Sequence, residues 1–246
     1  MPTHAIIPVK QLHESKRRLE HLLSPDERAE LIGRFLDNLL LTLSAAPVID
    51  RVLVVTCDPQ VVGLARRHGA DVLVEAAADG LNAAVERGVV RAVDEGATAV
   101  LVVPADLPFA RVEDIESMLQ PLTADRRPLE EGPGVRVQGL EVQGVPPLLR
   151  SPAPLRPLPN PLPEGEETVM VICPDEAEDG TNALLLAPPG GFTFHYGPDS
   201  FRAHLAEAER NGRAISIVHA PGLRFDLDTE SDWLVYNGYL VQVAEE

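Results

Sequence analysis

Short apolar runs recur along the chain, and the segments between them carry apolar residues three or four positions apart. An unbroken apolar run is typical of a strand buried on both faces, and the wider spacing is typical of an amphipathic helix. The pattern therefore predicts strands that alternate with helices. The expected strands cover residues 5–9, 52–56, 71–75, 99–103, 169–173, 183–186 and 214–219.

The first expected helix has the clearest start. Residues 24–27 read Ser-Pro-Asp-Glu, the pattern of an N-cap, a proline at the first helical position and a capping box. Its apolar face comprises Leu31, Phe35, Leu39 and Leu43, and Pro47 should end it. Further helices are expected to end at His68, to cover residues 81–95 and 201–211, and to begin near Arg111 and after a Thr229 cap. This alternation predicts an α/β fold with a mainly parallel sheet in a three-layer sandwich.

Residues 121–167 interrupt the alternation. They hold 11 of the chain's 23 prolines, a composition that cannot form a helix or an interior strand. We expect a single domain over residues 1–246 with this stretch as a Pro-rich insertion. Because the entropic cost of closing a loop grows slowly with its length, we expect the insertion to be functionally neutral.

Composition narrows the function classes. The net charge of −17 counts against a nucleic-acid or anionic membrane partner, since both need a basic surface. No segment approaches the roughly 18 to 20 apolar residues of a membrane span, and the chain starts without a charged leader, so we expect a cytoplasmic protein. Cys57 and Cys173 lack metal-binding spacing and are expected to be buried thiols.

A carboxylate lies where one of the expected strands ends. The apolar run over residues 99–103 stops at Asp106, which lies between two prolines. A residue at the carboxyl end of a parallel strand faces the edge where α/β sheets bind ligands. The alternative interpretation is that Asp106 caps the helix that begins near Arg111.

Basic residues follow the first expected strand. The only two lysines, Lys10 and Lys16, lie there with Arg17 and Arg18 in an otherwise acidic chain. This cluster is interpreted as a triphosphate site, with a solvated loop as the alternative. Loops at residues 79–82 and 225–229, the second of them carrying acidic residues, should lie at or next to the same edge. Carboxylates and basic side chains on one edge suit metal-assisted phosphoryl or nucleotidyl transfer.

Seven short motifs occur in a specific order along the chain. They comprise residues 7–10, 15–19, 80–82, 104–108, 179–182, 196–200 with His204 behind them, and 226–229. In this order they resemble the guanylyltransferases of deazaflavin coenzyme (coenzyme F-420) biosynthesis, which couple GTP to phosphoenolpyruvate or 2-phospho-L-lactate. The resemblance implies a three-layer, Rossmann-like nucleotidyltransferase fold of the nucleotide-diphospho-sugar transferase type, and a reaction that releases pyrophosphate.

The resemblance also implies a metal site and a set of catalytic cations. Magnesium would be held by Asp106 together with Asp226 or Asp228, and the sequence does not choose between the last two. The side chains expected to stabilise the departing pyrophosphate are Lys10, Lys16 and Arg18.

Substrate contacts are implied in the same way. The acceptor would bind at Thr181, Gly197 and Ser200, and hydroxyls with free backbone N–H groups at a helix start do suit an anion. Ser200 could instead, or at the same time, be an ordinary N-cap. Gly80 and Asn82 are expected to contact the base and ribose of GTP.

The expected reaction is a direct attack of an acceptor phosphate oxygen on the α-phosphorus of GTP. A phosphate monoester is largely ionised near pH 7, so no general base is needed, and His195 and His204 are interpreted as packing residues or as residues that support the substrate contacts. Phosphoenolpyruvate is the expected acceptor, with 2-phospho-L-lactate or 3-phosphoglycerate as alternatives.

The same residues also fit two different classes of protein. One is a molybdopterin- or cytidylyl-type nucleotidyltransferase, and the second is a non-catalytic nucleotide-binding regulatory domain. The apolar terminal helix carries Trp233, Tyr236 and Tyr239, which could pack either a homodimer partner or the core.

Overall fold

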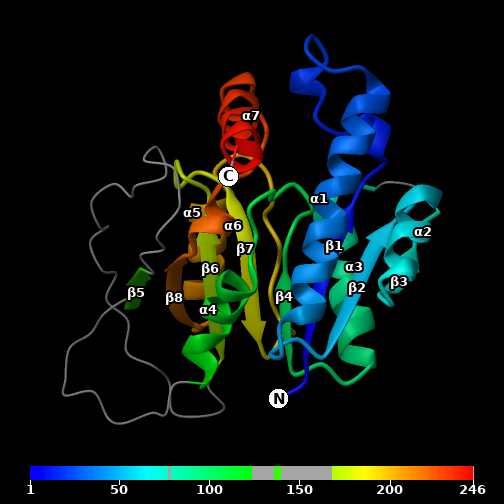
Figure 1. Cartoon of the computed structure of the whole chain (residues 1–246). Helices are drawn as coiled ribbons and strands as arrows, with labels where there is room; N and C mark the ends of the chain where they lie inside the picture. Colours follow the sequence, from blue (N-terminus) through cyan, green and yellow to red (C-terminus); the bar gives the residue numbers. More distant parts are fainter. Residues whose placement is uncertain (77–78, 124–135, 140–167, 246) are drawn as a thin grey trace.

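A computed structural model describes residues 1–76, 79–123, 136–139 and 168–245. One eight-stranded sheet organises them, in the order β3-β2-β1-β4-β7-β6-β8-β5 (Figure 1). The strands are β1 (Thr3–Val9), β2 (Arg51–Thr56), β3 (Asp71–Val74), β4 (Ala99–Val102), β5 (Arg136–Gly139), β6 (Val169–Pro174), β7 (Thr181–Ala187) and β8 (Ala214–His219). Strand β7 is antiparallel to both β4 and β6, and all the other strand pairs are parallel.

Helices cover both faces of this sheet. They are α1 (Pro25–Ala45), α2 (Pro59–Arg67), α3 (Leu81–Asp94), α4 (Val112–Thr123), α5 (Ser200–Arg210), α6 (Pro221–Arg224) and α7 (Glu230–Glu245), with 3-10 turns η1 (Leu12–Glu14) and η2 (Arg17–Leu19). Strand β1 shows how the two cores arise, because Ala5 and Ile7 pack with α1, α2 and α4 while Ile6 packs with α3 and α5. The three-layer, mainly parallel α/β sandwich is therefore confirmed.

Local capping signals act where they were expected. The Ser24 hydroxyl accepts from the Glu27 N–H at 3.3 Å, and the Glu27 carboxylate accepts from the Ser24 N–H at 2.8 Å, which confirms the capping box of α1. Thr229 and Asp232 make the same exchange at the start of α7. The aromatic residues of α7 face inward, since Tyr236 lies edge-on to Phe35 with ring centroids 5.2 Å apart. Core packing therefore accounts for Tyr236, and a homodimer partner for this helix stays a prediction.

Two elements were not expected. Strand β5 falls inside the Pro-rich stretch and pairs with β8 at the edge of the sheet, where a strand needs only one neighbour. Helix α6 is a four-residue turn that starts at Pro221. Helix α4 also continues through Pro121 to Thr123. The remainder of the expected insertion, residues 124–135 and 140–167, lies outside the described residues.

Two further expectations concern the cysteines and the membrane. Cys57 and Cys173 are free thiols. Cys173 is buried, and burial raises its pKa to about 12. Cys57 is only half-buried and lines a cavity at the end of β2, so the expectation of a buried thiol is wrong for it. Among the described residues, no helix combines the length and the apolar character needed to cross a bilayer.

Candidate active site

The site forms at the carboxyl edge of the sheet. Strands β1 and β4 end there, and β7, which runs in the opposite direction, starts there. A cavity of about 320 Å³ opens at this edge between the basic loop, the start of α3 and the loop after β4. Five residues that the sequence singled out line it: Lys10, Lys16, Gly80, Asp106 and Asp228.

Lys16 is the centre of the charged group. Its Nζ lies 2.7 Å from Asp106 Oδ2 and 2.7 Å from Asp228 Oδ1, although only 7 % of the residue is exposed. Burial by itself lowers the pKa of Lys16, but the two carboxylates outweigh it and the pKa is raised, so the ammonium stays charged. Helix α4 begins at Val112, and the Arg111 N–H before it donates to Asp114, so the interpretation of Asp106 as the cap of this helix is wrong.

The backbone at Lys16 is in the left-handed region, with φ of 51°. This conformation is costly for a residue with a Cβ and needs support from its surroundings. The buried Arg28 of α1 gives that support, donating from Nε to the Ser15 carbonyl at 3.1 Å and from Nη1 to the Leu23 carbonyl at 2.9 Å. Arg28 was missed in the sequence, where it appears as one more charged residue on a surface helix.

Three carboxylates, Asp106, Asp226 and Asp228, share two bonded cations, Lys16 and Arg18. Burial, together with the charge of Asp106, raises the pKa of Asp226 to about 6. Its only hydrogen bond in the described part of the chain comes from the Asn182 amide at 3.4 Å. For Asp228, burial favours the neutral acid, but Lys16 and Arg18 outweigh it and lower the pKa. Arg18 Nη1 lies 3.2 Å from Asp228 Oδ2 on the exposed side.

A second polar group consists of Thr181 and Ser200. Thr181 directly precedes Asn182, whose side-chain amide donates to Asp226. Thr181 and Ser200 are both buried, and the Ser200 hydroxyl donates to Thr181 Oγ1 at 3.3 Å. Asp199, not Ser200, is the N-cap of α5, so the N-cap interpretation of Ser200 is wrong. Gly197 precedes it with φ of +140°, in the region that favours glycine.

His204 fixes the hydrogens of this group. Burial lowers its pKa to about 4, so the ring is neutral and carries one N–H. Its Nε2 accepts from the His195 N–H at 2.9 Å, which places the proton on Nδ1, 3.0 Å from Thr181 Oγ1. Two hydrogens thus point at Thr181 Oγ1, and the Thr181 hydroxyl hydrogen remains to donate to a ligand.

The two expected nucleotide contacts differ in their surroundings. Gly80 lines the cavity as the N-cap of α3, with φ of +97°. Asn82 instead spans to the loop before α5, accepting from the Tyr196 N–H at 2.7 Å and donating to its carbonyl at 3.1 Å. Asn82 therefore ties the start of α3 to the loop that carries Gly197, and its contact with a nucleotide stays a prediction.

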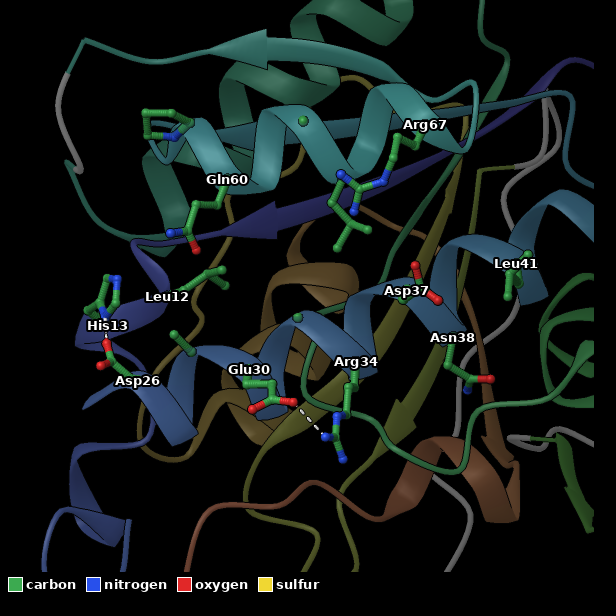
Figure 2. A pocket seen from close by; sticks show the side chains of 15 residues that line it. Leu12, His13, Asp26, Glu30, Arg34, Asp37, Asn38, Leu41, Gln60 and Arg67 are labelled. Atoms are coloured by element: carbon green, nitrogen blue, oxygen red, sulfur yellow. Dashed lines mark hydrogen bonds and ion pairs between the residues drawn. The ribbon is translucent and has the colours of Figure 1, made fainter. Parts of the chain in front are cut away.

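A larger hollow of about 840 Å³ lies elsewhere, between α1 and α2 (Figure 2). Gly33 and Gly63 lie in its walls, and a Cβ at either would meet nothing within 4 Å. In Figure 2 Arg34 turns to Glu30 of its own helix, so the charges there are paired locally. The smaller cavity, with its buried lysine and surplus carboxylates, is the better candidate for chemistry.

Comparisons with known proteins find relatives of this chain. The family model described as "Guanylyl transferase CofC like" matches residues 3–126. A "Phosphoenolpyruvate guanylyltransferase" of Rubrobacter xylanophilus is 36% identical over 94% of this chain and 92% of its own length. One of the same description from Sphaerobacter thermophilus is 31% identical over 94% and 91%.

Solved structures show the same fold. A putative nucleotide-diphospho-sugar transferase of Desulfovibrio desulfuricans aligns with a TM-score of 0.61 at 14% identity, over 96% of this chain and 87% of that one. Glucosyl-3-phosphoglycerate synthase of Mycobacterium tuberculosis, solved with Mn²⁺ and uridine diphosphate, aligns with a TM-score of 0.57 at 11% identity, over 95% and 75%.

Proposed function

This chain belongs to the CofC-like guanylyl transferase family, and we propose that it transfers GMP from GTP to phosphoenolpyruvate and releases pyrophosphate, in coenzyme F-420 biosynthesis. The observation that carries the proposal is the buried Lys16 ammonium between Asp106 and Asp228, beside a cavity at the ligand-binding edge of the sheet. The names of the curated relatives support phosphoenolpyruvate as the acceptor.

The residues present fit a divalent cation. The site holds three carboxylates, and burial together with the charge of Asp106 raises the pKa of Asp226, so a positive charge beside it would stabilise the ionised carboxylate. Carboxylate oxygens are also the ligands that magnesium prefers. We propose that Asp106, together with Asp226 or Asp228, supplies ligands for Mg²⁺; in the described part of the chain no three His, Cys, Asp or Glu side chains are grouped as a ready metal site. A bound cation of this kind neutralises charge on the phosphates of the nucleotide.

The remaining side chains divide between the two substrates. Lys16, with Lys10 and Arg18 on the open side, would face the phosphates of GTP and stabilise the charge that builds up on pyrophosphate. The Thr181 hydroxyl hydrogen, Ser200 and the backbone at Gly197 would bind the carboxylate and phosphate of the acceptor. An acceptor phosphate oxygen then attacks the α-phosphorus, and the bond from that phosphorus to pyrophosphate breaks.

The test is pyrophosphate release from the purified protein with GTP and Mg²⁺, run separately with phosphoenolpyruvate, 2-phospho-L-lactate and 3-phosphoglycerate. We expect release with phosphoenolpyruvate and a loss of at least about a hundredfold in Asp106→Asn, because the charge that positions Lys16 and the cation is gone. The matched control is Asp26→Asn, whose side chain is 96% exposed, and it should keep full activity.

Each competing function has its own result. Release with 2-phospho-L-lactate or 3-phosphoglycerate only would keep the reaction and change the acceptor. Release with CTP and not with GTP would favour a cytidylyl-type enzyme. Binding of GTP without release with any acceptor would favour the regulatory domain, and equal activity in Asp106→Asn would contradict the proposed site.

A further inference from the structure

One carboxylate in the wall of the cavity has no part in the reaction described above. Glu75 directly follows β3, and its backbone N–H donates to the Thr56 carbonyl at 2.9 Å. Its side chain is only 7% exposed and lines the same cavity as Lys16 and Asp106. A buried carboxylate inside a nucleotide site is acceptor-only and needs donors.

The sheet sets the distance between this carboxylate and the charged group. Strands β2 and β1 lie between β3 and β4, so three strand spacings separate the loop of Glu75 from the loop of Asp106. At about 4.8 Å each, these spacings give about 14 Å across the strand ends. A nucleotide with its α-phosphate at Asp106 and its ribose in the middle would therefore extend its base toward Glu75. Gly80, between the two, lets the backbone approach closely.

Arg87 of α3 holds the Glu75 side chain in place. Its Nε donates to Glu75 Oε1 at 2.7 Å, and its Nη2 lies against the same oxygen. Asp79 accepts from Arg87 Nη1 at 3.1 Å, so the guanidinium is itself anchored. In the described part of the chain, Glu75 Oε2 receives no hydrogen bond, and it remains available for a donor on a ligand.

The chemistry of the four bases decides which of them fits. Guanine presents two adjacent donors on its Watson–Crick edge, N1–H and the 2-amino group. In adenine and cytosine the amino group is flanked by a ring-nitrogen acceptor, and in uracil the N–H is flanked by two carbonyls. Because Arg87 occupies Oε1, the free Oε2 with its two lone pairs would accept from both N1–H and the 2-amino group of guanine, and it opposes the acceptors on the other bases.

We infer that Glu75, positioned by Arg87, reads the N1–H and 2-amino group of guanine and makes the enzyme specific for GTP. This rests on the proposed function, since it places GTP in the cavity next to Asp106. Glu75 would be a specificity residue remote from the reacting phosphates, and Arg87 a positioning residue that acts through it.

Glu75→Gln tests this against a purely structural role. Arg87 keeps the amide oxygen of the glutamine on its own side, so the amide NH₂ takes the place of Oε2, where it opposes both guanine donors and can donate to the 2-oxygen of xanthine. We expect kcat/KM for GTP to fall at least about tenfold, because guanine loses its hydrogen bonds to a charged carboxylate. We expect kcat/KM for XTP to rise, because the repulsion between the carboxylate and the 2-oxygen of xanthine is removed. ITP lacks the 2-amino group and should lose less than GTP.

A matched control is Glu95→Gln. Glu95 is a largely buried carboxylate that pairs with Arg91 and Arg51, away from the cavity, and its change should leave the GTP to XTP ratio as it is. Arg87→Met should weaken GTP binding without creating a preference for XTP. An unchanged GTP to XTP ratio in Glu75→Gln would overturn the inference.

A second readout separates this inference from the proposed reaction. Dissociation constants for GTP and XTP, measured by calorimetry without acceptor, report base selection whether or not pyrophosphate is released. Wild-type protein that binds GTP in preference to XTP, with the preference reversed in Glu75→Gln, supports the inference even if no acceptor reacts. If pyrophosphate is released but binding does not discriminate the bases, the reaction stands and the role of Glu75 is refuted.

Discussion

His204 shows how a single buried side chain can fix the hydrogens of a binding group. The ring is fully buried, and it connects the His195 backbone to the hydroxyl of Thr181. Protonation would turn Nε2 from an acceptor into a donor that faces the His195 N–H. The interpretation of His204 as a packing or supporting residue agrees with this geometry, because the buried ring orients Thr181 without needing to exchange a proton.

This arrangement predicts a pH dependence of stability. The pKa of His204 falls from 6.5 in the unfolded chain to about 4 in the fold, so the unfolded chain binds the proton first and the fold loses stability as pH falls below 6.5. His204→Gln keeps an acceptor for the His195 N–H but does not titrate. Between pH 7.5 and pH 5, the free energy of unfolding of wild type should drop by about 2 kcal/mol more than that of the variant.

Urea unfolding at the two pH values measures this difference. His21→Gln is the control, since the His21 side chain is 55% exposed and its substitution should not alter the pH response of the fold. If wild type and His204→Gln lose the same free energy between pH 7.5 and pH 5, the neutral buried imidazole is not the source of the effect.

At the scale of elements, the basic loop depends on α1. Arg28→Met removes donors from the Ser15 and Leu23 carbonyls, and we expect a loss of about 1 to 3 kcal/mol in the free energy of unfolding. Because Lys16 then loses support for its left-handed backbone, KM for GTP should rise while the KM for the acceptor changes little. Steady-state kinetics with each substrate varied in turn measures both.

Arg34→Met is the matched control on the same helix. The Arg34 side chain is 67% exposed and pairs only with Glu30 in the described part of the chain. Its loss should change neither the unfolding free energy nor the kinetics appreciably, since exposed ion pairs contribute little. A rise in the KM for GTP of the same size in both variants would mean that the basic loop does not rely on Arg28.

The elements differ in how far the sequence predicts them. Strands such as β1 and β4 are unbroken apolar runs, so a local pattern suffices, and the caps of α1 and α7 are local too. The direction of β7 leaves no local trace, because a strand buried on both faces shows the same apolar run whichever way it runs. That direction is nevertheless what brings Thr181 to the ligand-binding edge.

At the site, the types of residue were predictable and their partners were not. Asp106, Lys16 and Asp228 were all expected at one edge, and they do meet there. The partner of Asn82 is Tyr196, 114 positions away in the chain, and such a contact depends on how two loops pack. Arg28 was missed for the same reason, since its partners are backbone carbonyls that carry no sequence signal.

At the scale of the whole molecule, the site and β5, the strand that falls in the Pro-rich stretch, lie on different parts of the sheet. The cavity belongs to the half that contains β3, β1 and β4, while β5 is the outermost strand beyond β8 (Figure 1). The expected neutrality of the Pro-rich stretch refers to its effect on catalysis. The pairing of β5 with β8 is a separate effect, on the stability of the fold. An edge strand left without its neighbour exposes backbone donors and acceptors that can pair with another chain.

Two deletions separate these contributions. Replacing residues 140–166 with a Gly/Ser linker of about a dozen residues keeps β5 and a feasible return to β6, and should leave kcat/KM and solubility unchanged. Removing residues 124–166 also removes β5, so β8 becomes an edge, and we expect aggregation in sedimentation experiments while the monomeric fraction keeps its activity.

Loss of activity from the first deletion, with circular dichroism and unfolding unchanged, would mean that the stretch takes part in catalysis after all. Loss of activity only when β5 is removed would instead indicate that the outer strand holds β8 and β6 in position, and through them the start of β7 at the site.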